Sequence, residues 1–132
     1  MDGPPTLHGP LARAYGAALH AVAVADGELQ AIESARLDLL LERRCPGLDR
    51  EDLFFERTTP EGFAASVRAH GGDDLTAIGL GFVADAVELA TVDSELRAVE
   101  AHVILRVARA LGLSRLDVAS VTRALDEWLG SL

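Results

Sequence analysis

Apolar residues recur at three- and four-residue spacing along most of the chain, as they do in α-helices that each bury one face. The first such helix is expected to begin at Pro10 and to end at Asp26-Gly27, because glycine readily adopts the left-handed conformation that ends helices. A second helix is expected from Gln30 to about Arg44, ending before Cys45-Pro46-Gly47. The residues of this second helix that are expected to face the core are Ile32, Leu37, Leu40 and Leu41.

The later helices are bounded by residues that are typical of helix ends. Asp49 is expected to cap a short helix, and Thr59-Pro60 is expected to begin a further helix that ends at Gly71-Gly72. The stretch over residues 75–91 is apolar enough to form a central helix, and another helix is predicted over residues 97–111.

Ser114 and Asp117 resemble a capping box that opens a last helix. The apolar residues expected to dock this helix on the core are Leu116, Val121, Leu125, Trp128 and Leu129. No alternating run of β-branched residues competes with these helices, so the predicted fold is all-α, a compact bundle of six to seven helices. Residues 10–132 are expected to form this single domain, after a flexible leader at residues 1–9.

An acidic turn between two helices is written twice in the sequence. The stretch ADGELQAIE at residues 25–33 is matched in register by VDSELRAVE at residues 92–100. The acidic pairs are Asp26 with Asp93, Glu28 with Glu95, and Glu33 with Glu100. Apolar positions in the flanking helices match as well, so the sequence predicts that the bundle is built from two related helix pairs.

The repeated acids have two interpretations. They can be structural, because aspartate tolerates turn geometry and carboxylates at the start of a helix gain roughly 0.3–1 kcal/mol from its dipole. Glu33 and Glu100 stand where a glutamate can accept a hydrogen bond from the amide that begins its own helix. Alternatively, the six carboxylates bind a divalent cation, calcium or magnesium. An independent EF-hand is excluded, because Val22 and Val24 stand where that loop requires oxygen ligands.

VAVADGELQAIE at residues 22–33, echoed by LATVDSELRAVEAHVILRVARALGLS at residues 89–114, resembles the TerB-like family, named for bacterial tellurite resistance. The likeness covers roughly residues 10–125. It implies a compact helical fold, a role in the response to tellurite and other toxic agents, and acidic turns that bind divalent metal. The chain departs from the family pattern at Gln30 and Arg97, where members often have serine or threonine, and at Ser94, which replaces a glycine.

The chain carries 12 basic and 21 acidic residues, a net charge of −9, and every basic residue is an arginine. Such a chain repels phosphate backbones, so nucleic acid is excluded as the expected partner. Cations and basic protein surfaces fit its charge better. A protein partner is therefore expected, a homodimer is left open, and no apolar run is long enough to predict a membrane span.

The sequence shows no catalytic motif. The four histidines lack metal-binding spacing, no serine lies in G-x-S-x-G, and the glycines of AIGLGF are expected to permit close helix contact. The single cysteine, Cys45, fits a reducing compartment and is expected to be a small apolar side chain that closes a helix. No signal segment is recognised before Pro10, so the expected location is cytoplasmic. We therefore expect a non-enzymatic, stress-associated binding or adaptor protein, with a divalent-cation sensor as the alternative.

Overall fold

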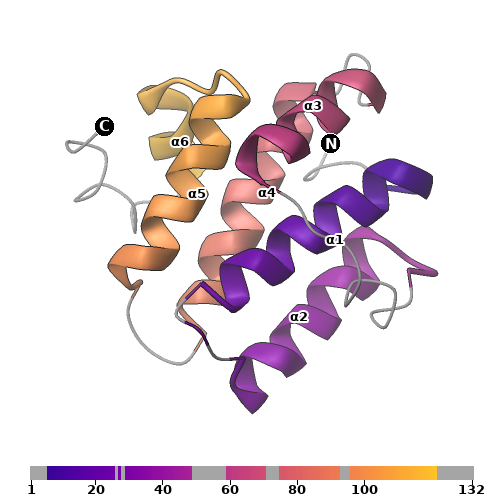
Figure 1. Cartoon of the computed structure of the whole chain (residues 1–132), viewed down its shortest axis with the longest axis vertical. Coiled ribbons are helices and arrows are strands. Elements are labelled where there is room, and N and C mark those ends of the chain that lie inside the picture. Colours follow the sequence, from indigo (N-terminus) through magenta and orange to yellow (C-terminus); the bar gives the residue numbers. More distant parts are fainter. Residues whose placement is uncertain are drawn as a thin grey trace.

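The computed structural model describes residues 6–25, 27, 29–48, 59–70, 75–92 and 96–121. These residues form six helices and no strand, packed as a compact bundle, which confirms the all-α prediction (Figure 1). The helices are α1 (Gly9–Ala23), α2 (Ala31–Arg44), α3 (Pro60–His70), α4 (Leu75–Ala90), α5 (Ala98–Ala110) and α6 (Arg115–Val121).

The central helix is α4, which packs against each of the other five helices. Figure 1 shows α1 crossing in front of α4. Helix α2 lies below α1 in this view, and α5 lies beside α4. The composition of α4 explains its position, because apolar or small residues occupy almost all of its surface. The buried residues of α4 are Ile78, Gly79, Gly81, Phe82, Val83, Asp85, Ala86, Val87, Leu89 and Ala90. The central helix predicted from the sequence is therefore confirmed.

Three aromatic rings from three helices form the middle of the core. Tyr15 of α1 lies edge-on to Phe63 of α3 and to Phe82 of α4, with ring centroids 6.0 Å and 5.6 Å apart. The two phenylalanine rings are 4.8 Å apart. All three side chains are fully buried, and edge-to-face pairs of this kind add to the free energy of simple burial.

Two predicted helix starts are confirmed by their hydrogen bonds. Thr59 Oγ1 accepts the Gly62 N–H at 2.9 Å, and Pro60 is the first residue of α3. At the start of α6, Ser114 N–H donates to Asp117 Oδ2 at 3.0 Å, and Asp117 N–H donates to Ser114 Oγ at 3.1 Å. Ser114 and Asp117 therefore form a complete capping box.

The corner between α5 and α6 is a tight turn built on Gly112. Gly112 has a φ of +76°, its N–H donates to Arg109 O, and the Leu113 N–H donates to Ala108 O, the two bonds of a Schellman motif. This corner packs closely on α4, because a Cβ added at Gly79 would lie 3.2 Å from a methyl carbon of Leu111. The close contact expected of the AIGLGF glycines is observed at Gly79, with side chains of the turn between α5 and α6 in place of a helix.

Two residues expected to face the core are exposed instead. Ile32 is 49% exposed and Leu116 is 82% exposed, while the residues buried beside them are Glu33 and Val118. Leu7, inside the predicted leader, is buried, and its N–H donates to Arg44 O at 2.7 Å. The short helix predicted at Asp49 and the apolar residues Leu125, Trp128 and Leu129 lie outside the described residues.

Candidate functional site

The ends of α1 and α4 and the starts of α2 and α5 lie toward the same end of the bundle. In Figure 1, the end of α1, the start of α2, the end of α4 and the start of α5 all lie in the lower part of the view. Helix α1 also packs against both α4 and α5. The described residues on either side of the two acidic turns therefore lie toward one end of the bundle.

Glu33 and Glu100 occupy equivalent and fully buried positions at the two joints, the starts of α2 and α5. Each lies at the third position of its helix, and both side chains have 0% exposure. Glu33 Oε1 accepts the Gln30 backbone N–H at 3.2 Å, and Glu100 Oε1 accepts the Arg97 backbone N–H at 3.1 Å. The carboxylates thus satisfy backbone donors that the first turn of a helix leaves open, as the structural interpretation expects.

The residue before each glutamate points outward in both joints. Ile32 is 49% exposed and Val99 is 46% exposed, although both are large and apolar. Successive helical residues are turned by about 100°, so a glutamate that points into the core carries its predecessor toward solvent. Turning the glutamate inward is therefore the physical reason why the prediction for Ile32 was wrong.

Four of the six carboxylates named as cation ligands lie outside the described residues; they are Asp26, Glu28, Asp93 and Glu95. Among the residues that the structure does describe, no group of three or more histidine, cysteine, aspartate or glutamate side chains could hold a metal ion. Glu33 and Glu100 are donors of the kind that calcium and magnesium accept, but each already binds a backbone N–H. The shared-cation interpretation stays a prediction.

A buried polar cluster that the sequence reasoning missed is centred on Asp85 of α4. The Tyr15 hydroxyl donates to Asp85 Oδ2 at 2.6 Å. Arg44, at the end of α2, donates from Nε to Oδ2 at 2.8 Å and from a terminal nitrogen to Oδ1 at 3.2 Å. Asp85 is only 2% exposed, so this carboxylate joins α1, α2 and α4 from inside the bundle.

The cluster continues to the surface as a row of charges between α2 and α4. Arg43 lies 3.7 Å from Asp85 and 3.6 Å from Glu88, and Arg36 lies 3.1 Å from Glu88. These outer side chains are partly exposed, so each pair is worth at most about 1 kcal/mol.

The groups around Asp85 are held in their protonated forms. Burial raises the pKa of Tyr15 well above its ordinary value of 10.0, and the Asp85 carboxylate raises it further. Hydrogen bonds to Asp85 raise the pKa of Arg44. Burial, together with the charge of Asp85, raises the pKa of the Cys45 thiol to about 12, although Arg44 opposes this change.

Cys45 is therefore a structural side chain. It is 1% exposed, and its Sγ lies 3.7 Å from the carbonyl oxygen of Ala12, to which the thiol donates a weak hydrogen bond. A reactive cysteine needs accessible thiolate, and a pKa of about 12 leaves almost none at neutral pH. The expectation of a small apolar residue closing α2 is confirmed.

One signal in the sequence could have revealed the cluster. Asp85 is the single charged residue between Leu75 and Val87, and it falls three positions after Phe82 on the buried side of α4. A lone carboxylate on such a face needs a buried cation or hydroxyl partner. Tyr15 lies on the buried face of α1, and its hydroxyl was a possible hydrogen-bond donor to Asp85.

The outer face of α2 combines exposed apolar side chains with charge. Ile32 is 49% exposed and Leu39 is 58% exposed, and seven positions of separation place them on one face of the helix. Beside Leu39 lies an open hollow of about 410 Å³, whose other lining residues are Arg36, Glu42, Arg43 and Glu88. An apolar residue rimmed by charges of both signs is a surface suited to a protein contact.

In comparisons with known proteins, no family model, no curated protein and no solved structure matched this chain. The resemblance to the TerB-like family therefore rests on the sequence alone, in the stretches at residues 22–33 and 89–114. In the described part of the chain, no helix is long and apolar enough to cross a membrane.

Proposed function

We propose that this chain is a non-enzymatic adaptor domain of the TerB-like, tellurite-resistance type, which acts in the cytoplasm by binding another protein. The observation that carries the proposal is the outer face of α2. Ile32 and Leu39 are exposed there beside charged residues, although the same helix buries four other side chains in the core. A helix with an inner face in the core and a second apolar stripe outside is suited to hold a partner.

The paired motifs at residues 25–33 and 92–100 support the stress-related part of this proposal. The chemistry of the Asp85 cluster supports the non-enzymatic part. Its carboxylate is bound by Tyr15 and Arg44, and its neighbouring thiol stays protonated at neutral pH. These groups are occupied in holding helices together, so they are poorly placed to serve as a base or a nucleophile.

Proximity labelling in cells tests the adaptor role with two matched variants. Leu39→Glu places a charge in the exposed apolar stripe, and Ala65→Glu places the same charge at an exposed position of α3. We expect Leu39→Glu to remove a reproducible set of labelled proteins that Ala65→Glu retains. In a strain lacking the chain, Leu39→Glu is also expected to restore growth on tellurite less well than Ala65→Glu. Identical labelling and growth for the two variants would rule out the α2 face as the adaptor surface.

A divalent-cation sensor is the second candidate function. It is favoured by the equivalent burial of Glu33 and Glu100 at two joints that lie toward one end of the bundle. An ion shared by the two turns would link the helix pairs, so that binding would change how firmly α2 and α5 are held.

A further inference from the structure

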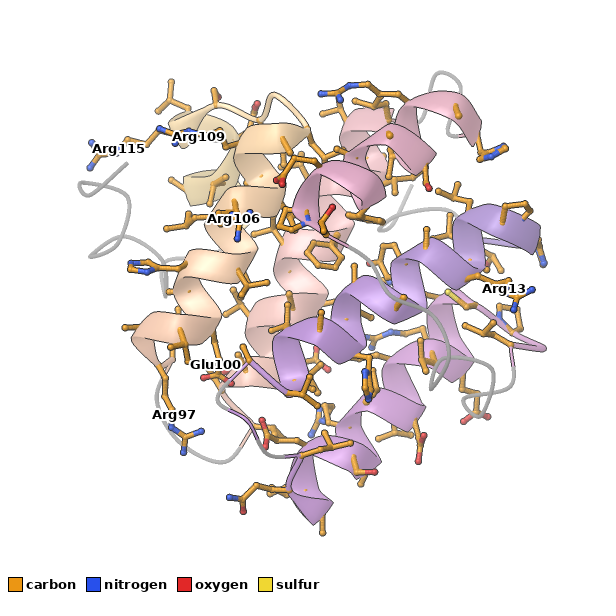
Figure 2. All side chains as sticks on the ribbon, viewed as in Figure 1. Arg13, Arg97, Glu100, Arg106, Arg109 and Arg115 are labelled. Atoms are coloured by element: carbon orange, nitrogen blue, oxygen red, sulfur yellow. The ribbon has the colours of Figure 1, made fainter. Side chains whose placement is uncertain are left out.

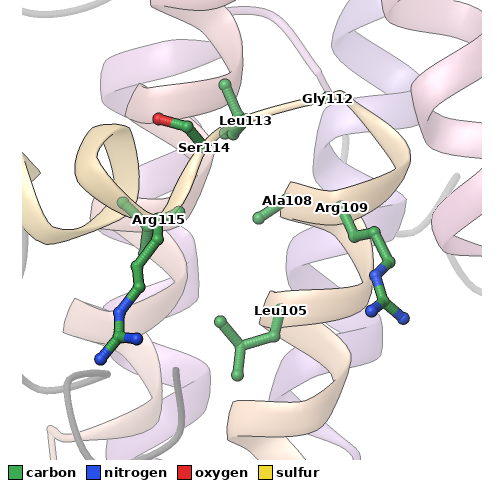
Figure 3. A pocket seen from close by; sticks show the side chains of 8 residues that line it. Leu105, Ala108, Arg109, Gly112, Leu113, Ser114 and Arg115 are labelled. Atoms are coloured by element: carbon green, nitrogen blue, oxygen red, sulfur yellow. The ribbon is translucent and has the colours of Figure 1, made fainter. Parts of the chain in front are cut away.

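The corner between α5 and α6 forms a small, partly open pocket. The Schellman turn at Gly112 and the capping box of Ser114 direct α6 back alongside α5 and leave a pocket of about 210 Å³ between them (Figure 3). The apolar residues that line the pocket are Leu105, Ala108, Leu113 and Val118. Pockets for drug-sized molecules are usually about 300–1,000 Å³, so this one is of a size for a single large side chain.

Two arginines flank the pocket from different helices. Figure 3 shows Arg109 of α5 and Arg115 of α6 on opposite sides of Leu105 and Ala108, with both guanidinium groups extended. Neither arginine makes an ion pair or side-chain hydrogen bond with another described residue, and no carboxylate is among the residues that line the pocket. The nearby carboxylate of Asp117 accepts the Ser114 N–H within the capping box.

The segment that forms α5 and α6 is basic in a strongly acidic chain. Residues 96–121 contain four arginines and two acids, a net charge of +2, whereas the whole chain carries −9. One of those acids, Glu100, is buried. Arg109 and Arg115 lie together at the α5–α6 corner in Figure 2, whereas Arg106 pairs with Glu61 of α3 at 3.3 Å. Leu116, which is 82% exposed, adds an apolar contact next to Arg115.

We propose that the α5–α6 corner docks an acidic peptide segment of a partner protein, which inserts one large apolar side chain into the pocket and places carboxylates against Arg109 and Arg115. Guanidinium groups recognise carboxylates through paired hydrogen bonds, and the apolar pocket supplies the burial that a surface ion pair lacks. A nucleic acid would match the two charges but not the apolar pocket, and it would meet the repulsion of the remaining chain. The inference rests on the adaptor role proposed above and names the chemistry of a partner at a different face from α2.

A peptide-display selection against the full chain tests the site without assuming a partner. We expect enriched peptides to carry Asp or Glu beside Leu, Ile, Phe or Trp. A fluorescein-labelled copy of the most enriched peptide is then titrated against the protein by fluorescence anisotropy. Arg109→Glu and Arg115→Glu are each expected to weaken its binding about tenfold and to reduce the salt dependence. Both side chains are exposed, so these variants should fold, which circular dichroism verifies.

Arg13→Glu is the matched control, because Arg13 is an exposed arginine on α1, far across the molecule from Arg109 and Arg115 in Figure 2. It changes the net charge equally and should leave the peptide affinity within about twofold of the parent. The proposal is overturned if no peptide is enriched, if enriched peptides are neutral or basic, or if Arg13→Glu weakens binding as much as Arg109→Glu.

The chain itself contains an acidic and apolar stretch, LDEWL at residues 125–129, with the only tryptophan. If Arg109→Glu shifts the emission of Trp128 and no external peptide binds the parent protein, the pocket serves this chain's own residues and the partner proposal is wrong. The adaptor role is tested separately through Leu39→Glu in cells. If no peptide binds at the α5–α6 corner, the labelling result for Leu39→Glu can still support the adaptor role. If Leu39→Glu changes neither labelling nor growth, the peptide titration can still be interpreted on its own.

Discussion

The Tyr15 hydroxyl and the Asp85 carboxylate are 2.6 Å apart, although 70 positions separate them in the chain. The same carboxylate accepts two hydrogen bonds from Arg44, so three helices meet at one buried acid. A buried charge of this kind is costly when it loses its partners, because the remaining groups can no longer be solvated. Asp85 is thus the residue whose loss should reveal how the bundle is held together.

Asp85→Ala is expected to lower the free energy of unfolding by about 3–5 kcal/mol, because it leaves the Arg44 guanidinium and the Tyr15 hydroxyl without their acceptor. Glu88→Ala is the control on the same helix. Its side chain is 39% exposed, so its loss should cost less than about 1 kcal/mol. Urea unfolding followed by circular dichroism measures both values. Equal costs for the two variants would show that the buried cluster contributes no more than the surface row.

The stability of the protein should fall at alkaline pH. The pKa of Cys45 is raised from 9.0 to about 12, and that of Tyr15 is raised well above 10.0, so the folded state keeps protons that the unfolded chain releases. Stability is therefore unaffected by these groups below about pH 9 and is lost as the pH rises toward 12. Each group contributes at most about 1.4 kcal/mol per pH unit.

Urea unfolding between pH 7 and 10.5 measures this loss. Cys45→Ala should remove most of the fall in the free energy of unfolding between pH 9 and 10. In this range the cysteine of the unfolded chain titrates, while its tyrosine still holds the proton. Above pH 10, the absorbance of the single tyrosine at 295 nm should rise together with unfolding. Tyrosinate that forms in the folded protein near pH 10 would contradict the burial of Tyr15.

Helix positions could be predicted from the sequence because their signals are local. Apolar spacing and end residues such as Thr59 and Ser114 specify helices within a few positions, and the structure places α3 and α6 accordingly. Burial at the ends of helices could not be predicted in the same way. The Glu33 side chain points into the core and accepts a backbone N–H. As a result, the side chain of Ile32 is exposed although it is apolar.

The Asp85 cluster and the α5–α6 pocket depend on contacts that are distant in sequence. Tyr15, Arg44 and Asp85 come together only after three helices have packed, so no spacing rule relates them. The pocket depends on the path of the chain at Gly112, since that turn sets the position of α6 relative to α5. Local patterns predict the elements, whereas these sites arise from the packing of the elements.

Glu33 and Glu100 should respond alike to substitution if both serve as helix-start acceptors. Glu33→Gln keeps an oxygen that can accept the Gln30 N–H and should change stability by less than about 1 kcal/mol. Glu33→Ala removes the acceptor and should cost about 0.5–2 kcal/mol. The same two changes at Glu100 should rank in the same order, as urea unfolding will show. A cost at one joint without a cost at the other would argue that the two helix pairs are not equivalent.

The shared-cation interpretation makes a different prediction for the same turns. If Asp26, Glu28, Asp93 and Glu95 surround an ion together with the two glutamates, these carboxylates repel one another without it. Millimolar calcium or magnesium should then raise the melting temperature, because a ligand that binds only the folded state stabilises it by RT ln(1 + [L]/Kd). The double variant Asp26→Asn, Glu28→Gln should be more stable than the parent without metal and should lose the response.

If the turns are only joints, a divalent cation should act through ionic strength alone, and sodium chloride at equal ionic strength should match its effect. Asp26→Asn should then change stability by well under about 1 kcal/mol, since asparagine serves a turn nearly as well as aspartate. The sodium control is therefore the measurement that separates the two interpretations. The hydrogen bonds from Gln30 and Arg97 already give Glu33 and Glu100 a structural role, so we expect sodium and calcium to act alike. A rise in melting temperature with calcium, beyond the rise that sodium gives, would establish an ion site at the two turns.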